Sequence, residues 1–174
     1  MKDRKYRIGI DARIYSLPGG LGRYTRELIH GLEKIDKENQ YYIFLNKEGY
    51  ESYIPKGDNF HKVLADVGWY GFAEQLKMPR IWKSVHPDLM HFAHFNKSIF
   101  YRGPYVVTIH DLTYSVAARE GMKISKLPPL IFEIKQFVYE RVIKDVIKKS
   151  KEIIVPSYNS NSLILVLIDL AVVV

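Results

Sequence analysis

Short apolar runs of strand length alternate with longer amphipathic segments through most of this chain. The runs are rich in β-branched and aromatic residues, and the segments between them have the apolar spacing of helices. The predicted strands are Arg7–Asp11, Tyr41–Leu45, Phe60–Ala65, Asp88–Phe92, Tyr105–His110 and Lys151–Val155, and the predicted helices are Tyr24–Ile35, Ala73–Lys83 and Pro128–Lys149. This alternation predicts an α/β fold, namely a Rossmann-like, open and mainly parallel sheet with helices on both faces.

Local signals refine these elements. Thr25 or Gly22 is expected near the N-cap of the first helix, whose apolar spacing predicts a buried face that reaches Ile35. The polar segment 46–49 is predicted to end the second strand. Pro79 is an obstacle to the second helix and predicts a kink or a break there.

Composition narrows the class of protein. The 174 residues are 47% hydrophobic and 26% charged, which is typical of one soluble globular domain. The absence of cysteine excludes disulfides, thiolate metal sites and a cysteine nucleophile, and it fits a cytoplasmic location. The net charge of +7 favours an anionic partner or a solvated basic surface, and the scattered positions of the excess charge favour the second reading.

A glycine-rich turn, Gly19-Gly20-Leu21-Gly22, connects the first strand to the first helix. Glycines let a backbone approach a ligand closely, and a helix start offers unpaired N–H groups with a partial positive charge. The turn is therefore suited to a phosphate or another anion. An ordinary strand-to-helix connection is the alternative.

The carboxyl ends of the predicted strands carry the polar residues of interest, and in open parallel sheets ligands bind beyond those ends. His91 and His94 lie at one such end, but no carboxylate or third histidine stands at ligand spacing near them. We therefore expect no metal site, and we expect His91 to be packed in the structure.

Four segments together resemble glycosyltransferase family four. They are Ile8–Arg13 followed by Gly19–Tyr24, His91–Asn96, Val106–Tyr114 and Lys151–Ser157. The family consists of GT-B enzymes that use activated sugars and have two Rossmann-like domains facing a cleft. The resemblance implies the acceptor-side N-terminal domain of a retaining, nucleotide-sugar-dependent enzyme that needs neither a bound metal nor a cofactor.

The same resemblance implies roles for individual residues. It makes His110 and Asp11 the catalytic candidates, Gly19, Gly20 and Gly22 the loop against the donor diphosphate, and Arg13, Arg23, His94 and Asp111 the acceptor-side candidates. The aromatic residues Trp69, Tyr70 and Phe72 are expected in the core, with a sugar platform or an exposed acceptor loop as the alternatives.

The end of the chain departs from the family pattern. Residues 1–160 are predicted to form the family-four-like domain, and the apolar tail 161–174 is expected to reflect a truncation. Nothing in the chain replaces the donor-binding domain, so the chain is expected to be inactive alone unless another polypeptide supplies that domain.

The expected partners are a nucleotide sugar and a glycan or lipid-linked acceptor, without nucleic acid. Peripheral contact with the inner membrane surface is left open, as suits a lipid-linked acceptor. Two other classes of function also stay open: a non-catalytic interaction protein and a dinucleotide-binding module. Against the module, the loop lacks the G-x-G-x-x-G spacing, and Asn46 rather than an acid follows the second strand.

Overall fold

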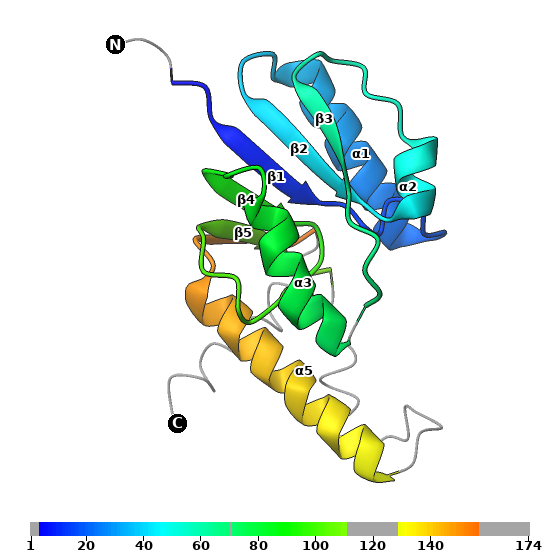
Figure 1. Ribbon diagram of the computed structural model, residues 1–174, viewed down its shortest axis with the longest axis vertical. Helices are drawn as coiled ribbons and strands as arrows, with labels where there is room; N and C mark the ends of the chain where they lie inside the picture. Colours follow the sequence, from blue (N-terminus) through cyan, green and yellow to red (C-terminus); the bar gives the residue numbers. More distant parts are fainter. Residues whose placement is uncertain (1–3, 70, 111–128, 157–174) are drawn as a thin grey trace.

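The computed structural model describes residues 4–69, 71–110 and 129–156, the side chains of 129–138 excepted. Six strands in the described residues form one sheet in the order β3-β2-β1-β4-β5-β6, and every neighbouring pair is parallel (Figure 1). The strands are β1 (Arg7–Asp11), β2 (Gln40–Leu45), β3 (Phe60–Leu64), β4 (Leu89–Phe92), β5 (Tyr105–Thr108) and β6 (Glu152–Ile154). The predicted α/β open sheet is confirmed, and β5 ends two residues before the predicted position.

Helices cover both faces of the sheet because successive residues of a strand point to opposite faces and apolar side chains lie on both. Ile43 of β2 packs in a cluster with Ile29 of helix α1 (Gly20–Ile35), whereas its neighbour Phe44 belongs to a second cluster on the opposite face. That second cluster includes Trp82 of α3 (Phe72–Lys83) and Val146 of α5 (Pro129–Lys149). In Figure 1, α3 and α5 accordingly lie together on one side of the sheet.

Helix α1 begins earlier than predicted. Its first residue is Gly20, and its N-cap is Gly19 with φ of 83°, a left-handed conformation that glycine adopts without strain. The predicted caps Gly22 and Thr25 lie inside the helix and are buried. Ile35 is 80% exposed, so the predicted buried face ends before it.

A short helix, α2 (Lys47–Ser52), follows β2, which ends before segment 46–49 as predicted. The side chain of Asn46 accepts a hydrogen bond of 2.9 Å from the backbone N–H of Gly49, which is the geometry of an N-cap. The polar residues that end β2 therefore also begin a helix.

Helix α3 runs through Pro79 without a break. A proline at this position gives no N–H to the carbonyl of Gln75, four residues earlier. That carbonyl instead accepts a hydrogen bond of 2.7 Å from the Ser98 hydroxyl, and the Gln75 side-chain oxygen accepts one of 3.0 Å from the N–H of Ile99. Of the predicted kink or break, the break is therefore wrong, and the proline is a point where α3 joins the segment after β4.

The second half of α5 is held to the same segment by a buried charge. Lys97 is fully buried, donates to Asp145 at 2.9 Å and lies over the ring of Tyr105. Asp145 also forms an ion pair with Lys149, one turn later on the same helix. Asp145 thus serves a buried contact with Lys97 as well as a more exposed one with Lys149.

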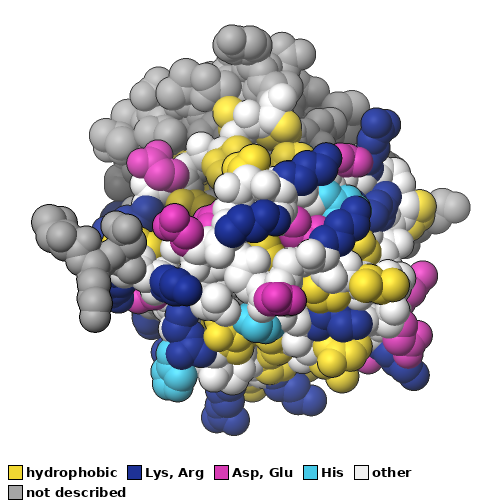
Figure 2. Space-filling model, turned by 90° about the horizontal axis from the view of Figure 1, so that it is seen from above, with side chains coloured by type: hydrophobic (Ala, Val, Ile, Leu, Met, Phe, Trp, Pro, Cys, Tyr) yellow, Lys and Arg dark blue, Asp and Glu magenta, His cyan; other side chains and the backbone are white. Residues whose placement is uncertain are grey.

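The surface carries mixed charges. Figure 2 shows Lys and Arg side chains dispersed among acidic and apolar ones on the face it presents, rather than gathered in a single basic patch. Among the described residues, no helix has both the length and the apolar character needed to cross a membrane.

Candidate functional site

The strands β1, β4 and β5 end at the same edge of the sheet. Asp11, the last residue of β1, is paired with Phe92, the last residue of β4, and Phe92 is paired with Val107 of β5. The segments that follow these strands therefore start side by side. They contain most of the residues expected at a ligand site, including His94 and His110.

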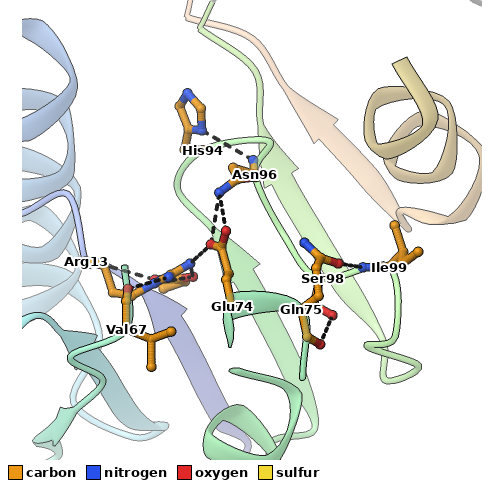
Figure 3. A network of polar contacts seen from close by, with 9 residues as sticks. Arg13, Val67, Glu74, Gln75, His94, Asn96, Ser98 and Ile99 are labelled. Atoms are coloured by element: carbon orange, nitrogen blue, oxygen red, sulfur yellow. Dashed lines mark hydrogen bonds and ion pairs between the residues drawn. The ribbon is translucent and has the colours of Figure 1, made fainter. Parts of the chain in front are cut away.

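A buried ion-pair network joins two of these segments to α3 (Figure 3). The guanidinium of Arg13 donates to Asp11 at 2.9 Å and to Glu74, in the first turn of α3, at 2.7 Å. Glu74 also accepts two hydrogen bonds from the side-chain amide of Asn96, at 2.9 and 3.0 Å. Loop 93–96 is in this way tied both to α3 and to the residues after β1.

The network is almost inaccessible to water. Arg13 is 1% exposed and Glu74 is fully buried. Burial alone would lower the pKa of Arg13, but its charge contacts and hydrogen bonds with Asp11 and Glu74 outweigh burial and raise that pKa above its usual value. Arg13 also lies over the ring of Trp69, with 4.8 Å from Cζ to the ring centroid. The guanidinium therefore remains charged and is held on several sides.

His110 follows β5 and is half-buried. Its Nε2 lies 2.9 Å from the carbonyl oxygen of Ala93. Because a carbonyl only accepts, Nε2 carries the hydrogen, and in the neutral ring Nδ1 is the acceptor nitrogen. The ring of His94 lies 6.3 Å away at an angle of 22°, so two imidazoles from neighbouring strand ends are nearly parallel.

Tyr24, near the start of α1, contacts the residues at the end of β5. Its hydroxyl lies 3.0 Å from the hydroxyl of Thr108, the last residue of β5, and its ring meets His110 edge-on with 4.6 Å between centroids. The hydroxyl of Thr108 is also 2.9 Å from Nε2 of His91. His91 is 7% exposed, and burial lowers its pKa to about 4, so the ring is neutral at pH 7 and is packed as predicted.

The glycine turn lies one helical turn before Tyr24. Gly19 and Gly20 are exposed, whereas Gly22 is buried against the turn, where an added Cβ would lie 1.9 Å from the carbonyl oxygen of Leu17. Arg26 donates to the carbonyls of Tyr15 and Leu17 and so secures the turn from inside. The first turn of α1 contains no acidic residue, which leaves the partial positive charge of the helix start uncompensated there.

The family model described as Glycosyltransferase Family 4 matches residues 18–164. This chain belongs to glycosyltransferase family 4. The match covers the glycine turn, Glu74, the loop after β4 and His110, and it begins after Asp11 and Arg13. A comparison with curated proteins found no match.

Within this glycosyltransferase-family domain, the predicted site residues lie in different surroundings. Gly19, Gly20, Gly22 and His110 lie at one edge and are linked through Tyr24. Arg23 is exposed in the first turn of α1. Asp11 and Arg13 are buried in the ion-pair network, with the Arg13 side chain directed inward. Asp111 and the tail 161–174 lie outside the described residues.

Of the three aromatic residues expected in the core, Phe72 differs from the prediction. Phe72 is 91% exposed, so its expected place in the core is wrong; as the first residue of α3, it lies on the solvated side of that helix. Trp69 is half-buried and contacts the ring of His94 with 6.2 Å between centroids, while Tyr70 lies outside the described residues. His94 accepts a 3.3 Å hydrogen bond from the N–H of Asn96.

Sequence reasoning missed Glu74 and gave Asn96 no role. A glutamate in the first turn of a helix is ordinarily a solvated residue that complements the helix dipole, so its type and position give no sign of burial. The Asp-x-Arg spacing of Asp11 and Arg13 after a strand does indicate a local ion pair. Among the described residues, no group of three or more histidines and carboxylates could hold a metal ion.

Proposed function

We propose that this domain is the acceptor-side half of a retaining, nucleotide-sugar-dependent glycosyltransferase of the GT-B type. Family membership and the parallel sheet support the class of enzyme. The observation that carries the assignment of the site is the contact of Tyr24 with His110 and Thr108, because it places the glycine turn and the imidazole at one edge of the sheet.

The glycine turn is assigned to the diphosphate of the sugar donor. The N–H groups of residues 20–22 lie in the first turn of α1, before the first hydrogen bond of the helix. That bond joins the N–H of Arg23 to the carbonyl of Gly19. Such amides, with the dipole of a 16-residue helix behind them, stabilise negative charge. Charge develops on the diphosphate as it leaves the sugar, so fixed donors there lower the barrier.

His110 is assigned to a hydroxyl of the transferred sugar or of the acceptor. The hydrogen bond from Nε2 to the Ala93 carbonyl fixes the orientation of the imidazole ring at the end of β5. Arg23, exposed beside the turn, suits an anionic group of the acceptor or donor.

Asp11 and Arg13 act through position rather than by contact in this assignment. Arg13 bridges Asp11 to Glu74, and Glu74 holds Asn96. The pair thus fixes the loop after β4, which carries both His94 and the carbonyl that orients His110. We assign the nucleotide pocket to a second domain, on the same polypeptide or another one, so these 174 residues are expected to be inactive alone.

A transfer assay tests the proposal. The chain is incubated with a panel of radiolabelled nucleotide sugars and with glycan and lipid-linked acceptors, with and without a donor-binding domain of the family. We expect transfer only when that domain is present, and a loss of about 100-fold in kcat for His110→Ala. Lys34→Gln, an exposed residue on the far part of α1, is the matched control and is expected to keep full activity.

Three outcomes would contradict parts of the proposal. No transfer from any donor in the completed enzyme would contradict the glycosyltransferase assignment. A product with inverted anomeric configuration, read by NMR, would contradict the retaining mechanism alone. Tight binding of a nucleotide sugar by the isolated chain in isothermal titration would contradict the assignment of the nucleotide pocket to another domain.

A further inference from the structure

The outward face of α3 combines large apolar side chains with basic ones. Phe72 is 91% exposed and Leu76, one turn later, is 63% exposed. The other exposed residues of the helix are Ala73, Lys77, Arg80, Lys83. The acid of α3, Glu74, is buried in the ion-pair network, so the exposed residues of this helix carry only positive charge.

These exposed residues form one continuous stripe. At 100° per residue, Phe72, Leu76, Lys83, Arg80 and Lys77 fall within an arc of about 140° on the helix. The opposite arc contains Met78 and Trp82, which are buried in the core. We call the five exposed side chains the α3 surface.

A segment bonded to α3 also has exposed aromatic and basic side chains. Ser98 and Ile99 bond to the backbone and side chain of Gln75, which holds their segment against α3. The next residue, Phe100, is 50% exposed, and Arg102 is also exposed.

We propose that the α3 surface binds the anionic surface of a phospholipid membrane. The ring of Phe72 and the side chain of Leu76 enter the region between the headgroups and the acyl chains, where these exposed apolar groups lose their contact with water. Lys77, Arg80 and Lys83 extend their charged ends to the lipid phosphates. The apolar and the basic side chains of the α3 surface then each contact a matching part of the membrane.

Charge argues against a second copy of this chain as the partner. In a symmetric dimer the same surface meets itself, so the three cations of one copy would face those of the other. The buried position of Glu74 removes the helix's own source of compensating charge. An anionic lipid surface provides the compensating negative charge.

This contact is independent of sugar transfer, because vesicle binding requires no donor or acceptor. It also has a geometric consequence for the domain. Phe72 opens the helix whose first turn contains Glu74, so membrane contact at Phe72 places the lipid near the end of α3 that holds the loop of His94 and Asn96.

Vesicle co-sedimentation is the test. The 174-residue chain is mixed with vesicles of phosphatidylcholine alone or with 30% phosphatidylglycerol at about 0.1 M salt. We expect binding to the anionic vesicles that weakens with salt. Lys77→Gln/Arg80→Gln/Lys83→Gln is expected to lose about 100-fold in partition coefficient, and Phe72→Ser/Leu76→Ser about tenfold or more.

Matched controls separate the surface from general charge and hydrophobicity. Lys5→Gln/Lys34→Gln/Lys47→Gln removes the same charge from exposed positions off α3, and Ile35→Ser/Ile54→Ser removes two exposed apolar side chains elsewhere. Both are expected to bind as the parent does. Circular dichroism confirms that each variant is folded.

A reporter on the surface gives a second measurement. Phe72→Trp places an indole at the most exposed position of α3, and we expect a blue shift of its emission with anionic vesicles and quenching by brominated lipids. Three results would overturn the proposal: no binding of the parent chain, equal losses in the α3 and control variants, or an α3-dependent dimer in ultracentrifugation without vesicle binding.

Discussion

The hydroxyl of Tyr24 lies 3.0 Å from the hydroxyl of Thr108, although 84 residues separate them in the chain. The contact joins the second turn of α1 to the end of β5. Because Thr108 also bonds to His91, the three side chains form one chain of hydrogen bonds across two strands and a helix. The position of the glycine turn relative to His110 depends on this connection.

Removing the Tyr24 hydroxyl is expected to weaken the fold modestly. Tyr24→Phe should lower the free energy of unfolding by about 1 kcal/mol, and Thr108→Val, which also deprives His91 of its partner, by about 2 kcal/mol. In urea denaturation the double variant should lose less than the sum, because both changes remove the same bond. Tyr6→Phe, at an exposed tyrosine, serves as control; additive losses would show that the two hydroxyls do not interact.

Neutralising Glu74 is expected to destabilise the domain and to disturb the histidines. Glu74→Gln keeps the shape but loses a charged acceptor for Arg13, and we expect a loss of about 1–3 kcal/mol in the free energy of unfolding. The NMR signals of the His94 and His110 rings should shift, because Asn96 loses one of the two oxygens that accept from its side-chain amide. Glu51→Gln, on the exposed side of α2, should change neither quantity, and an equal effect of both variants would contradict the role of Glu74.

Stability is expected to fall as the pH is lowered from about 6.5 towards 4. Burial lowers the pKa of His91 to about 4, below the value near 6.5 of an unfolded histidine. In this interval the unfolded chain binds a proton that the folded chain does not, so acid favours unfolding.

The loss attributable to His91 should reach about 2 kcal/mol by pH 5. Urea denaturation of the parent and of His91→Gln at pH 7.5 and pH 5 isolates this contribution. The slope of stability against pH should be smaller in the variant; parallel slopes would mean that His91 titrates normally in the folded protein.

Two glycines of α1 should respond in opposite ways to alanine. An alanine at Gly22 would place its Cβ 1.9 Å from the Leu17 carbonyl, so Gly22→Ala should cost about 1–3 kcal/mol and displace the glycine turn. Gly31 has no atom within 4 Å of an added Cβ, so Gly31→Ala should raise stability by about 0.5–1 kcal/mol. Thermal unfolding compares them, and a neutral Gly22→Ala would contradict the close approach.

The order of strands and helices could be predicted from the sequence because it depends on local patterns. β2 and β5 are apolar runs with β-branched and aromatic residues. The parallel pairing of β2 with β1 follows from helix α1 between them, whereas β5 pairs in parallel with β4 although no helix lies between those two strands. The family resemblance was readable for the same reason, since its motifs lie at strand ends. The fold class, and the placement of the glycine turn and His110 at the same edge of the sheet, could thus be predicted from the sequence.

Other features depend on distant contacts. α1 begins at Gly20 because Gly22 fits against Leu17, and helix propensity alone argues against glycines in a first turn. Glu74 is buried because Arg13, 61 residues earlier, and Asn96 meet it there. These contacting residues are brought together by the order of the strands in the fold, so no local sequence pattern predicts the contacts.

Pro79 shows how a missing amide can create a contact. With an ordinary residue at this position, its N–H would compete with Ser98 for the Gln75 carbonyl, and the helix would gain an internal bond while segment 98–99 lost an anchor. A substitution that improves α3 as an isolated helix would therefore loosen the connection between β4 and β5. The position at which α3 lacks an internal hydrogen bond is thus the point at which segment 98–99 is attached to it.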